Sequence, residues 1–128
     1  MSDSKASPLL EVGPLQAELR RFAEDRDWEQ FHSPKNLVMA LTGELGELAE
    51  LFQWSTEDES RRAASDPRTA SAVRDEIADV TLYLVRLADV LGVDLDAAVK
   101  AKLALNAAKY PAERFRGSSR KSSEGRAE

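Results

Sequence analysis

Two pairs of acidic residues have a spacing that could bind a metal ion. Glu44 and Glu47 form an E-x-x-E pair, and after a gap of 28 residues Glu76 and Asp79 form an E-x-x-D pair. Residues three apart on a helix lie on nearly the same face, so each pair would direct two carboxylates to one side. Carboxylate oxygens are the ligands that magnesium prefers. The pattern therefore predicts a site for a hard divalent cation, Mg²⁺, built from two helices.

Two other interpretations of these acids remain. They could be solvated surface carboxylates, but Glu44 falls near the middle of an apolar stripe, where an unpaired charge is costly. That stripe consists of Leu37, Leu41, Leu48 and Phe52, with Glu47 on its flank and Glu50 pointing away. A di-iron centre would need Glu-x-x-His pairs, and the single histidine, His32, is in no such pair. Magnesium is favoured over iron.

Cationic and aromatic side chains could complete a nucleotide site. Lys102, Asn106 and Lys109 follow the i, i+4, i+7 spacing of one helix face, which would suit a polyphosphate or be a solvated polar face. Trp28, His32 and Trp54 flank the helix that carries Glu44, where they could bind a nucleobase. The alternative is that the tryptophans fill gaps in the core and that His32 caps the helix.

The composition is that of a small globular domain. The chain has 128 residues, 42% of them hydrophobic and 32% charged, and a net charge of −5, which argues against a nucleic-acid partner. It has no cysteine, so disulfides, thiolate metal sites and a cysteine nucleophile are excluded. No signal sequence or membrane-spanning stretch is evident, and we expect a cytoplasmic protein.

The local signals predict an all-α fold, a small four-helix-type bundle. We expect a first helix from Gly13-Pro14 to about Asp27 and a second from Pro34 to about Trp54, after a Ser33 cap. A long helix should run from Asp66-Pro67 to Leu91, before Gly92, and a last one, capped by Asp94, should end before Pro111. Residues 55–58 resemble a capping box for a short extra helix or an ordered loop. The domain should cover residues 13–111, between a flexible N-terminus, 1–12, and a flexible basic and polar tail, 112–128.

The long helix before Gly92 has two apolar faces. Its predicted core stripe contains Val73, Ile77, Val80, Leu84 and Leu91, with Glu76, Asp79 and Tyr83 on one flank. Ala78, Leu82 and Val85 lie on the side opposite the core stripe. An apolar second face needs a second partner, so we expect a homo-oligomer.

Longer blocks of sequence carry a resemblance to a known family. The acidic pairs resemble the signature of the MazG-type all-alpha nucleotide pyrophosphohydrolases. The segments 26–32 (RDWEQFH) and 43–54 (GELGELAELFQW) resemble its dCTP pyrophosphatase branch, as do 75–83, 106–111 and, more faintly, 118–121. The similarity extends over about residues 15–121, and the tryptophan-flanked blocks make it specific.

The resemblance implies roles for particular residues. Glu44, Glu47, Glu76 and Asp79 would be the catalytic, magnesium-binding residues. The base and sugar pocket would contain Trp28, His32, Trp54 and Tyr83, and the phosphates would contact Lys102, Asn106 and Lys109. Family members form dimers or tetramers with composite sites. One departure is that related dCTP enzymes carry a base-contacting histidine on the first helix, where this chain has a residue such as Leu19 or Gln16.

The predicted function is Mg²⁺-dependent hydrolysis of a nucleoside triphosphate, dCTP or a modified pyrimidine deoxynucleotide, to the monophosphate and pyrophosphate. Magnesium at the acids would activate the attacking water, which Glu47 or Glu50 would orient. One alternative keeps the fold with another substrate, such as dUTP, another modified nucleotide or phosphoribosyl-ATP. Another is a non-catalytic helical oligomer that binds a cation or a partner helix.

Overall fold

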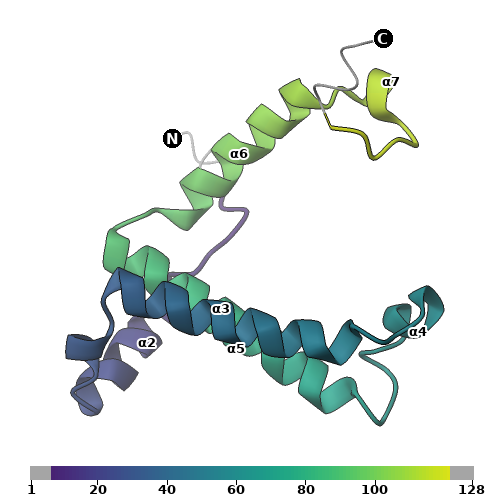
Figure 1. Ribbon diagram of the computed structural model, residues 1–128. Helices are drawn as coiled ribbons and strands as arrows, with labels where there is room; N and C mark the ends of the chain where they lie inside the picture. Colours follow the sequence, from purple (N-terminus) through teal and green to yellow (C-terminus); the bar gives the residue numbers. More distant parts are fainter. Residues whose placement is uncertain (1–6, 122–128) are drawn as a thin grey trace. The chain divides into compact units, whose positions relative to one another are not determined.

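The computed structural model describes residues 7–121, and every regular element in that range is a helix (Figure 1). In chain order these are α2 (Gly13–Asp25), the 3₁₀ helix η1 (Glu29–Phe31), α3 (Pro34–Phe52), α4 (Glu57–Arg61), α5 (Ala70–Leu91), α6 (Leu95–Lys109) and α7 (Ala112–Phe115). The predicted all-α class is confirmed. The chain divides into two compact units: the hairpin unit, Val12–Val93, and the terminal unit, which contains Met1–Glu11 and Asp94–Glu128.

Local capping interactions set several helix ends where the sequence predicts them. The Ser33 hydroxyl accepts a hydrogen bond from the Asn36 backbone N–H at 3.1 Å, which caps α3. Asp94 caps α6 in the same way, through its carboxylate and the Ala97 N–H at 3.0 Å. Gly92 ends α5 in the left-handed region, with φ of 71°, a conformation that costs glycine little.

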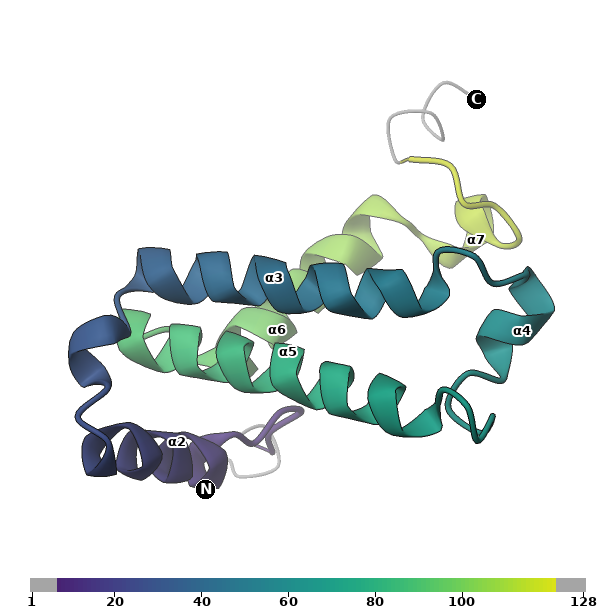
Figure 2. The ribbon, with the colours of Figure 1, turned by 60° about the horizontal axis from the view of Figure 1, so that its bottom comes forward.

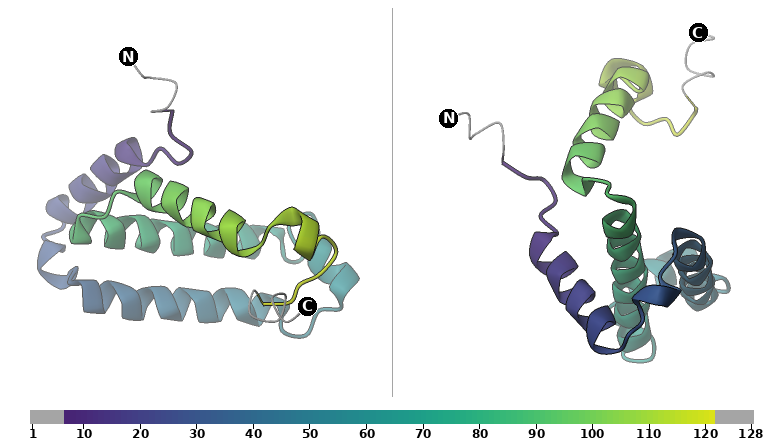
Figure 3. Two further views of the ribbon diagram at one scale, coloured as in Figure 1. Left: turned by 90° about the horizontal axis from the view of Figure 1, so that it is seen from above. Right: turned by 90° about the vertical axis from the view of Figure 1, so that its left-hand side faces the viewer.

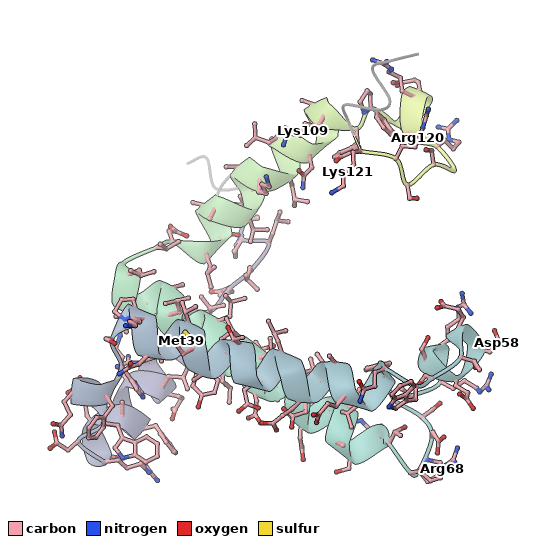
Figure 4. The ribbon with its side chains drawn as sticks, viewed as in Figure 1. Met39, Asp58, Arg68, Lys109, Arg120 and Lys121 are labelled. Carbon is pink, nitrogen blue, oxygen red and sulfur yellow. The ribbon has the colours of Figure 1, made fainter. Side chains whose placement is uncertain are left out.

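Two predicted boundaries are wrong by a few residues. The capping box of α4 pairs Thr56 with Glu59, not Ser55 with Asp58, because the Glu59 carboxylate reaches back to the Thr56 N–H at 2.9 Å. Helix α5 begins at Ala70 and not at Asp66-Pro67. Residues 66–69 form a turn, since the Asp66 carboxylate accepts hydrogen bonds from the backbone and side chain of Arg68. Figure 4 labels Asp58, which belongs to α4, and Arg68, which belongs to this turn.

The hairpin unit is organised around α3 and α5, which lie antiparallel and side by side (Figure 2). Helix α2 packs against α5 as well, and the views in Figure 3 show it close to α5. The most buried apolar side chains among the described residues are small: Ala23, Leu37, Ala63, Val73, Val85 and Ala88. The pairing of α3 with α5 is what brings the two acidic segments together.

The predicted inward stripe of α5 is only partly correct. Val73 is buried and Val80 is half-buried, but Ile77, Leu84 and Leu91 are exposed by 51%, 46% and 54%. Val85, which was expected opposite the core, is buried instead. The reason is that α5 packs against both α3 and α2, so a second side of the helix is covered within the chain. The uncovered apolar side chains, Ile77, Leu84 and Leu91, belong to the stripe predicted to face the core.

In the terminal unit, the segment before α2 is attached to α6. The Asp96 carboxylate accepts the backbone N–H groups of Leu9 and Leu10 at 2.6 and 3.0 Å. The Lys100 ammonium pairs with Asp96 and donates to the Ser7 carbonyl. The predicted tail also contains the short helix α7, which the sequence did not indicate.

The rings of Tyr110 and Phe115 explain the order around α7. They pack edge to face with their centroids 5.0 Å apart, so Phe115 supplies an apolar contact that a purely polar tail would lack. The segments 1–6 and 122–128 of the predicted flexible ends lie outside the described residues.

Candidate metal and nucleotide site

Three of the four predicted acids converge between α3 and α5. Glu44 and Glu47 come from successive turns of α3, and Glu76 comes from α5. One carboxylate oxygen of each lies within 4.8 Å of the others. Glu44 and Glu76 are half-buried, whereas Glu47 is exposed. The position of Glu44 on the inner stripe of α3 therefore does bring a carboxylate to the interface of the two helices.

The cluster carries more negative charge than its surroundings neutralise. Oxygen Oε1 of Glu76 is buried and has no hydrogen-bond partner among the residues described. The pKa of Glu76 is raised to about 7, first by a hydrogen bond with Glu44 that requires a proton, then by burial and by Glu47. Carboxylates that share a proton in the absence of a cation can coordinate a cation that replaces that proton. The donor set, three carboxylates with one unpartnered buried oxygen, fits a divalent metal ion.

Asp79 is not part of the three-acid cluster but lies one turn further along α5. It lines a cavity of about 270 Å³ in the hairpin unit. The other lining residues are Leu19, Phe22, Trp28, His32, Leu37, Leu82, Tyr83 and Arg86. Three of the predicted base-pocket residues, Trp28, His32 and Tyr83, are thus in one cavity together with the fourth acid. Asp79 connects the cavity to the helix face that carries Glu76.

The turn after α2 positions Trp28 and His32. Asp27 adopts a φ of 54°, and the chain then reverses so that the Trp28 N–H donates to the Ala23 carbonyl at 2.8 Å. The Trp28 ring packs edge to face on Phe22, with centroids 5.7 Å apart. The 3₁₀ helix η1 follows directly, and its C-terminal neighbour is His32. A short ordered connector therefore places both side chains at the cavity.

Arg86 is a cavity residue that the sequence analysis missed. It is 8% exposed, and its Nε–H donates to Nδ1 of His32 at 3.1 Å. Burial, and next the positive charge of Arg86, lower the pKa of His32, which favours a neutral imidazole. A signal was present in the sequence: Arg86 is the only charged residue between Asp79 and Asp89. A lone cation inside an apolar helical segment needs a partner.

Trp54 does not line this cavity. It follows the C-terminal end of α3, is 88% exposed and borders a different cavity of about 480 Å³ that also includes Glu50 and Arg68. Helix α3 has 19 residues, about 28 Å at 1.5 Å per residue, which separates its two ends. The structure therefore does not bring the two tryptophans of one chain together.

The predicted phosphate-binding residues belong to the terminal unit. Lys102 and Lys109 are exposed on α6, and Asn106 is half-buried between them (Figure 4 labels Lys109). Their spacing keeps them on one side of the helix. Contact of these three residues with phosphates stays a prediction.

The fold and site define an all-α protein with a carboxylate cluster between two antiparallel helices, next to a cavity with aromatic walls. The family model described as the MazG-like family matches residues 40–124, and the chain belongs to this family. Among curated relatives, dCTP pyrophosphatase 1 of Homo sapiens is 49% identical over 123 residues, which cover 96% of this chain and 71% of that protein. The Bos taurus protein of the same name is 47% identical, covering 91% and 68%.

A solved structure is similar as well. A pyrophosphatase from Archaeoglobus fulgidus superposes with a TM-score of 0.72 at 39% identity, covering 78% of this chain and 92% of that chain. Together these relatives confirm the predicted enzyme class, a nucleoside triphosphate pyrophosphohydrolase. Within residues 7–121, none of the helices combines the length and apolar character needed to cross a membrane.

Proposed function

We propose that this enzyme hydrolyses dCTP, or a modified pyrimidine deoxynucleoside triphosphate, to the monophosphate and pyrophosphate in a Mg²⁺-dependent reaction. The observation that carries the proposal is the convergence of Glu44, Glu47 and Glu76, with the unpartnered Glu76 oxygen, beside a cavity lined by Trp28 and Tyr83. The curated relatives named dCTP pyrophosphatase 1 support the choice of base.

Glu44, Glu47 and Glu76 would hold the magnesium ion, with Asp79 available from the next turn of α5. When bound, Mg²⁺ supplies Lewis-acid chemistry toward phosphate oxygens and lowers the pKa of water. The protein's part would be to orient the triphosphate and to place three carboxylates, with Asp79 one turn away, where the cation and the attacking water would meet. Glu47 is exposed and could also orient that water, and this chain needs no side-chain nucleophile for the reaction.

Other residues would bind the nucleotide. The base would stack on Trp28 within the cavity and contact His32 and Tyr83. Lys102, Asn106 and Lys109 would neutralise charge on the phosphates, including the pyrophosphate that leaves. We assign these roles to a domain covering residues 13–111.

A second copy of the chain would complete the site. The exposed apolar side chains Ile77, Leu84 and Leu91 follow one face of α5, and Met39 of α3 is exposed by 61% (Figure 4). A homodimer or homotetramer would cover such a face. Trp54, which is 88% exposed and outside the cavity of its own chain, would then reach the nucleotide of a neighbouring subunit.

A steady-state screen of nucleoside triphosphates tests the proposal. With Mg²⁺ present, kcat/KM should be highest for dCTP or one of its base-modified forms and should vanish after removal of divalent ions by EDTA. Asp79→Asn should lower the rate, and high Mg²⁺ should restore part of it, because mass action offsets weaker binding. Glu18→Gln, which changes an exposed glutamate of α2, is the matched control. A preference for dUTP or a purine nucleotide would contradict the assignment of the base, and no hydrolysis at all would favour the non-catalytic oligomer.

A further inference from the structure

Arg86 has an environment that is unusual for a charged side chain. It is the only buried charged residue within the described part of the chain, and it lies on α5 among apolar neighbours. Burial of a guanidinium is costly unless the charge is paired and its N–H groups are satisfied. Since arginine stays protonated at any accessible pH, the cost must be met by contacts.

The contacts of Arg86 form a chain that ends at the cavity. Its Nε–H donates to Nδ1 of His32 at 3.1 Å, and Nη1 approaches Asp89 at 3.5 Å. Asp89 in turn accepts two hydrogen bonds from Arg20 of α2, at 2.7 and 2.6 Å. The two short hydrogen bonds fix Asp89 firmly, whereas the 3.5 Å contact is at the outer limit of a hydrogen bond. The shortest polar contact of Arg86 itself is therefore the one to His32.

This contact restricts the chemical state of His32. An imidazole nitrogen that accepts a hydrogen bond cannot carry a proton, so Nδ1 is unprotonated and the ring proton resides on Nε2. The remaining polar atom of His32 is consequently a hydrogen-bond donor. A fixed donor in a cavity complements an acceptor on a nucleobase, such as a carbonyl oxygen or a pyridine-type ring nitrogen.

We infer that Arg86 is a positioning residue, which holds the His32 imidazole in one orientation and one tautomer at the cavity and is itself held by the Asp89–Arg20 pair. Arg86 acts through His32, and its effect is on recognition of the base. The inference rests on the proposed function only in treating the cavity as the base pocket. The hydrogen bond itself can be tested without substrate.

Nuclear magnetic resonance tests the contact directly, because His32 is the single histidine of the chain and needs no assignment among others. In protein labelled with ¹⁵N in arginine and histidine, a scalar coupling should connect Nε of Arg86 with Nδ1 of His32 at pH 8, where the imidazole is neutral. The His32 signals should also show one tautomer. Absence of this coupling, or protonation at Nδ1, would overturn the inference whether or not the enzyme hydrolyses nucleotides.

Kinetics tests the consequence. Arg86→Met should raise KM for the preferred nucleotide by about threefold to tenfold, the effect of one hydrogen bond, with kcat changed less than about twofold. Arg21→Met, an exposed arginine on α2, is the matched control and should leave both constants unchanged. If Arg86→Met does not fold, Arg86→Lys, which keeps a cation near Asp89 but lacks the planar Nε–H, replaces it with the same expectation.

A double-mutant cycle separates positioning from a general structural role. In a His32→Ala background, the change at Arg86 should no longer alter KM, because there is no imidazole left to position. An equal rise of KM in the presence and absence of His32 would overturn the inference, as would an unchanged KM in the single variant. An enzyme without activity toward any nucleotide would refute the proposed function, while the coupling measured by magnetic resonance would still decide the role of Arg86.

Discussion

Competition between a proton and magnesium at Glu76 should make metal binding strongly dependent on pH. Its pKa of about 7 means that about half of the Glu76 carboxyls are protonated at pH 7, roughly ten of eleven at pH 6 and one of eleven at pH 8. A protonated carboxyl cannot bind the cation, so affinity falls as the pH falls. The apparent dissociation constant for Mg²⁺ should therefore rise about tenfold from pH 8 to pH 6.

Calorimetric titration of the metal-free enzyme with Mg²⁺ at pH 6, 7 and 8, without nucleotide, measures this effect. In buffers with different heats of ionisation, binding at pH 7 should release about half a proton. Glu76→Gln should bind Mg²⁺ more weakly but with a much flatter dependence on pH, and the control Glu18→Gln should behave as the unchanged enzyme. Equal affinity at pH 6 and pH 8, or a full tenfold dependence in Glu76→Gln, would refute the reasoning.

Further predictions concern stability, catalysis, binding and assembly. Between pH of about 4.5 and about 7, Glu76 should lower the free energy of unfolding of the metal-free protein as the pH rises, because the folded state retains a Glu76 proton that the unfolded state releases. His32, whose pKa is lowered, contributes with the opposite sign, so chemical denaturation should show the Glu76 effect as the difference in slope between the unchanged protein and Glu76→Gln. Glu44→Gln should keep the helical circular dichroism spectrum but lower turnover by more than about a hundredfold, since even partners of metal ligands are worth about 10–100-fold. Trp28→Ala should weaken nucleotide binding by about 1–3 kcal/mol in equilibrium titrations, and an unchanged affinity would exclude stacking on this ring. Ile77→Glu should shift sedimentation toward the monomer if its exposed face is an interface between copies, and an unchanged distribution would exclude that face.

The parts of the fold that could be predicted depend on local interactions. The caps at Ser33 and Asp94 and the stop at Gly92 involve residues within one turn of each other, so the sequence contains them in full. The start of α5 was predicted too early because Asp66 forms a local turn with Arg68 in place of a helix cap. Whether Asp66 caps a helix or forms a turn depends on its contact with the Arg68 side chain, which the Asp-Pro pattern does not reveal.

Which apolar face of α5 is covered could not be predicted from periodicity. Ile77 and Val85 are both apolar, and the sequence does not say which side α2 and α3 occupy. In the structure Val73 and Val85, one from each predicted face, are both buried, whereas Ile77 of the predicted core stripe is exposed, so each face is covered only in part. The presence of apolar residues on two faces of α5 was predictable, because it depends only on which positions around the helix axis carry apolar residues.

The carboxylates of the site were predictable because their spacing reflects helical geometry and because Glu44 interrupts an apolar stripe. The contribution of Arg86 was not, since it depends on a contact with His32, 54 residues away in the sequence. The Arg20–Asp89 pair that supports it joins residues 69 apart. Such long-range polar contacts have no local pattern.

Identification of the products formed from dCTP and Mg²⁺ tests the central claim most directly. Anion-exchange chromatography of the reaction, with pyrophosphate and phosphate assayed separately, should show dCMP and pyrophosphate in equal amounts and neither product with Glu44→Gln. Formation of dCDP and phosphate, or no hydrolysis of dCTP or any other pyrimidine deoxynucleoside triphosphate by the folded, Mg²⁺-loaded enzyme, would contradict the claim.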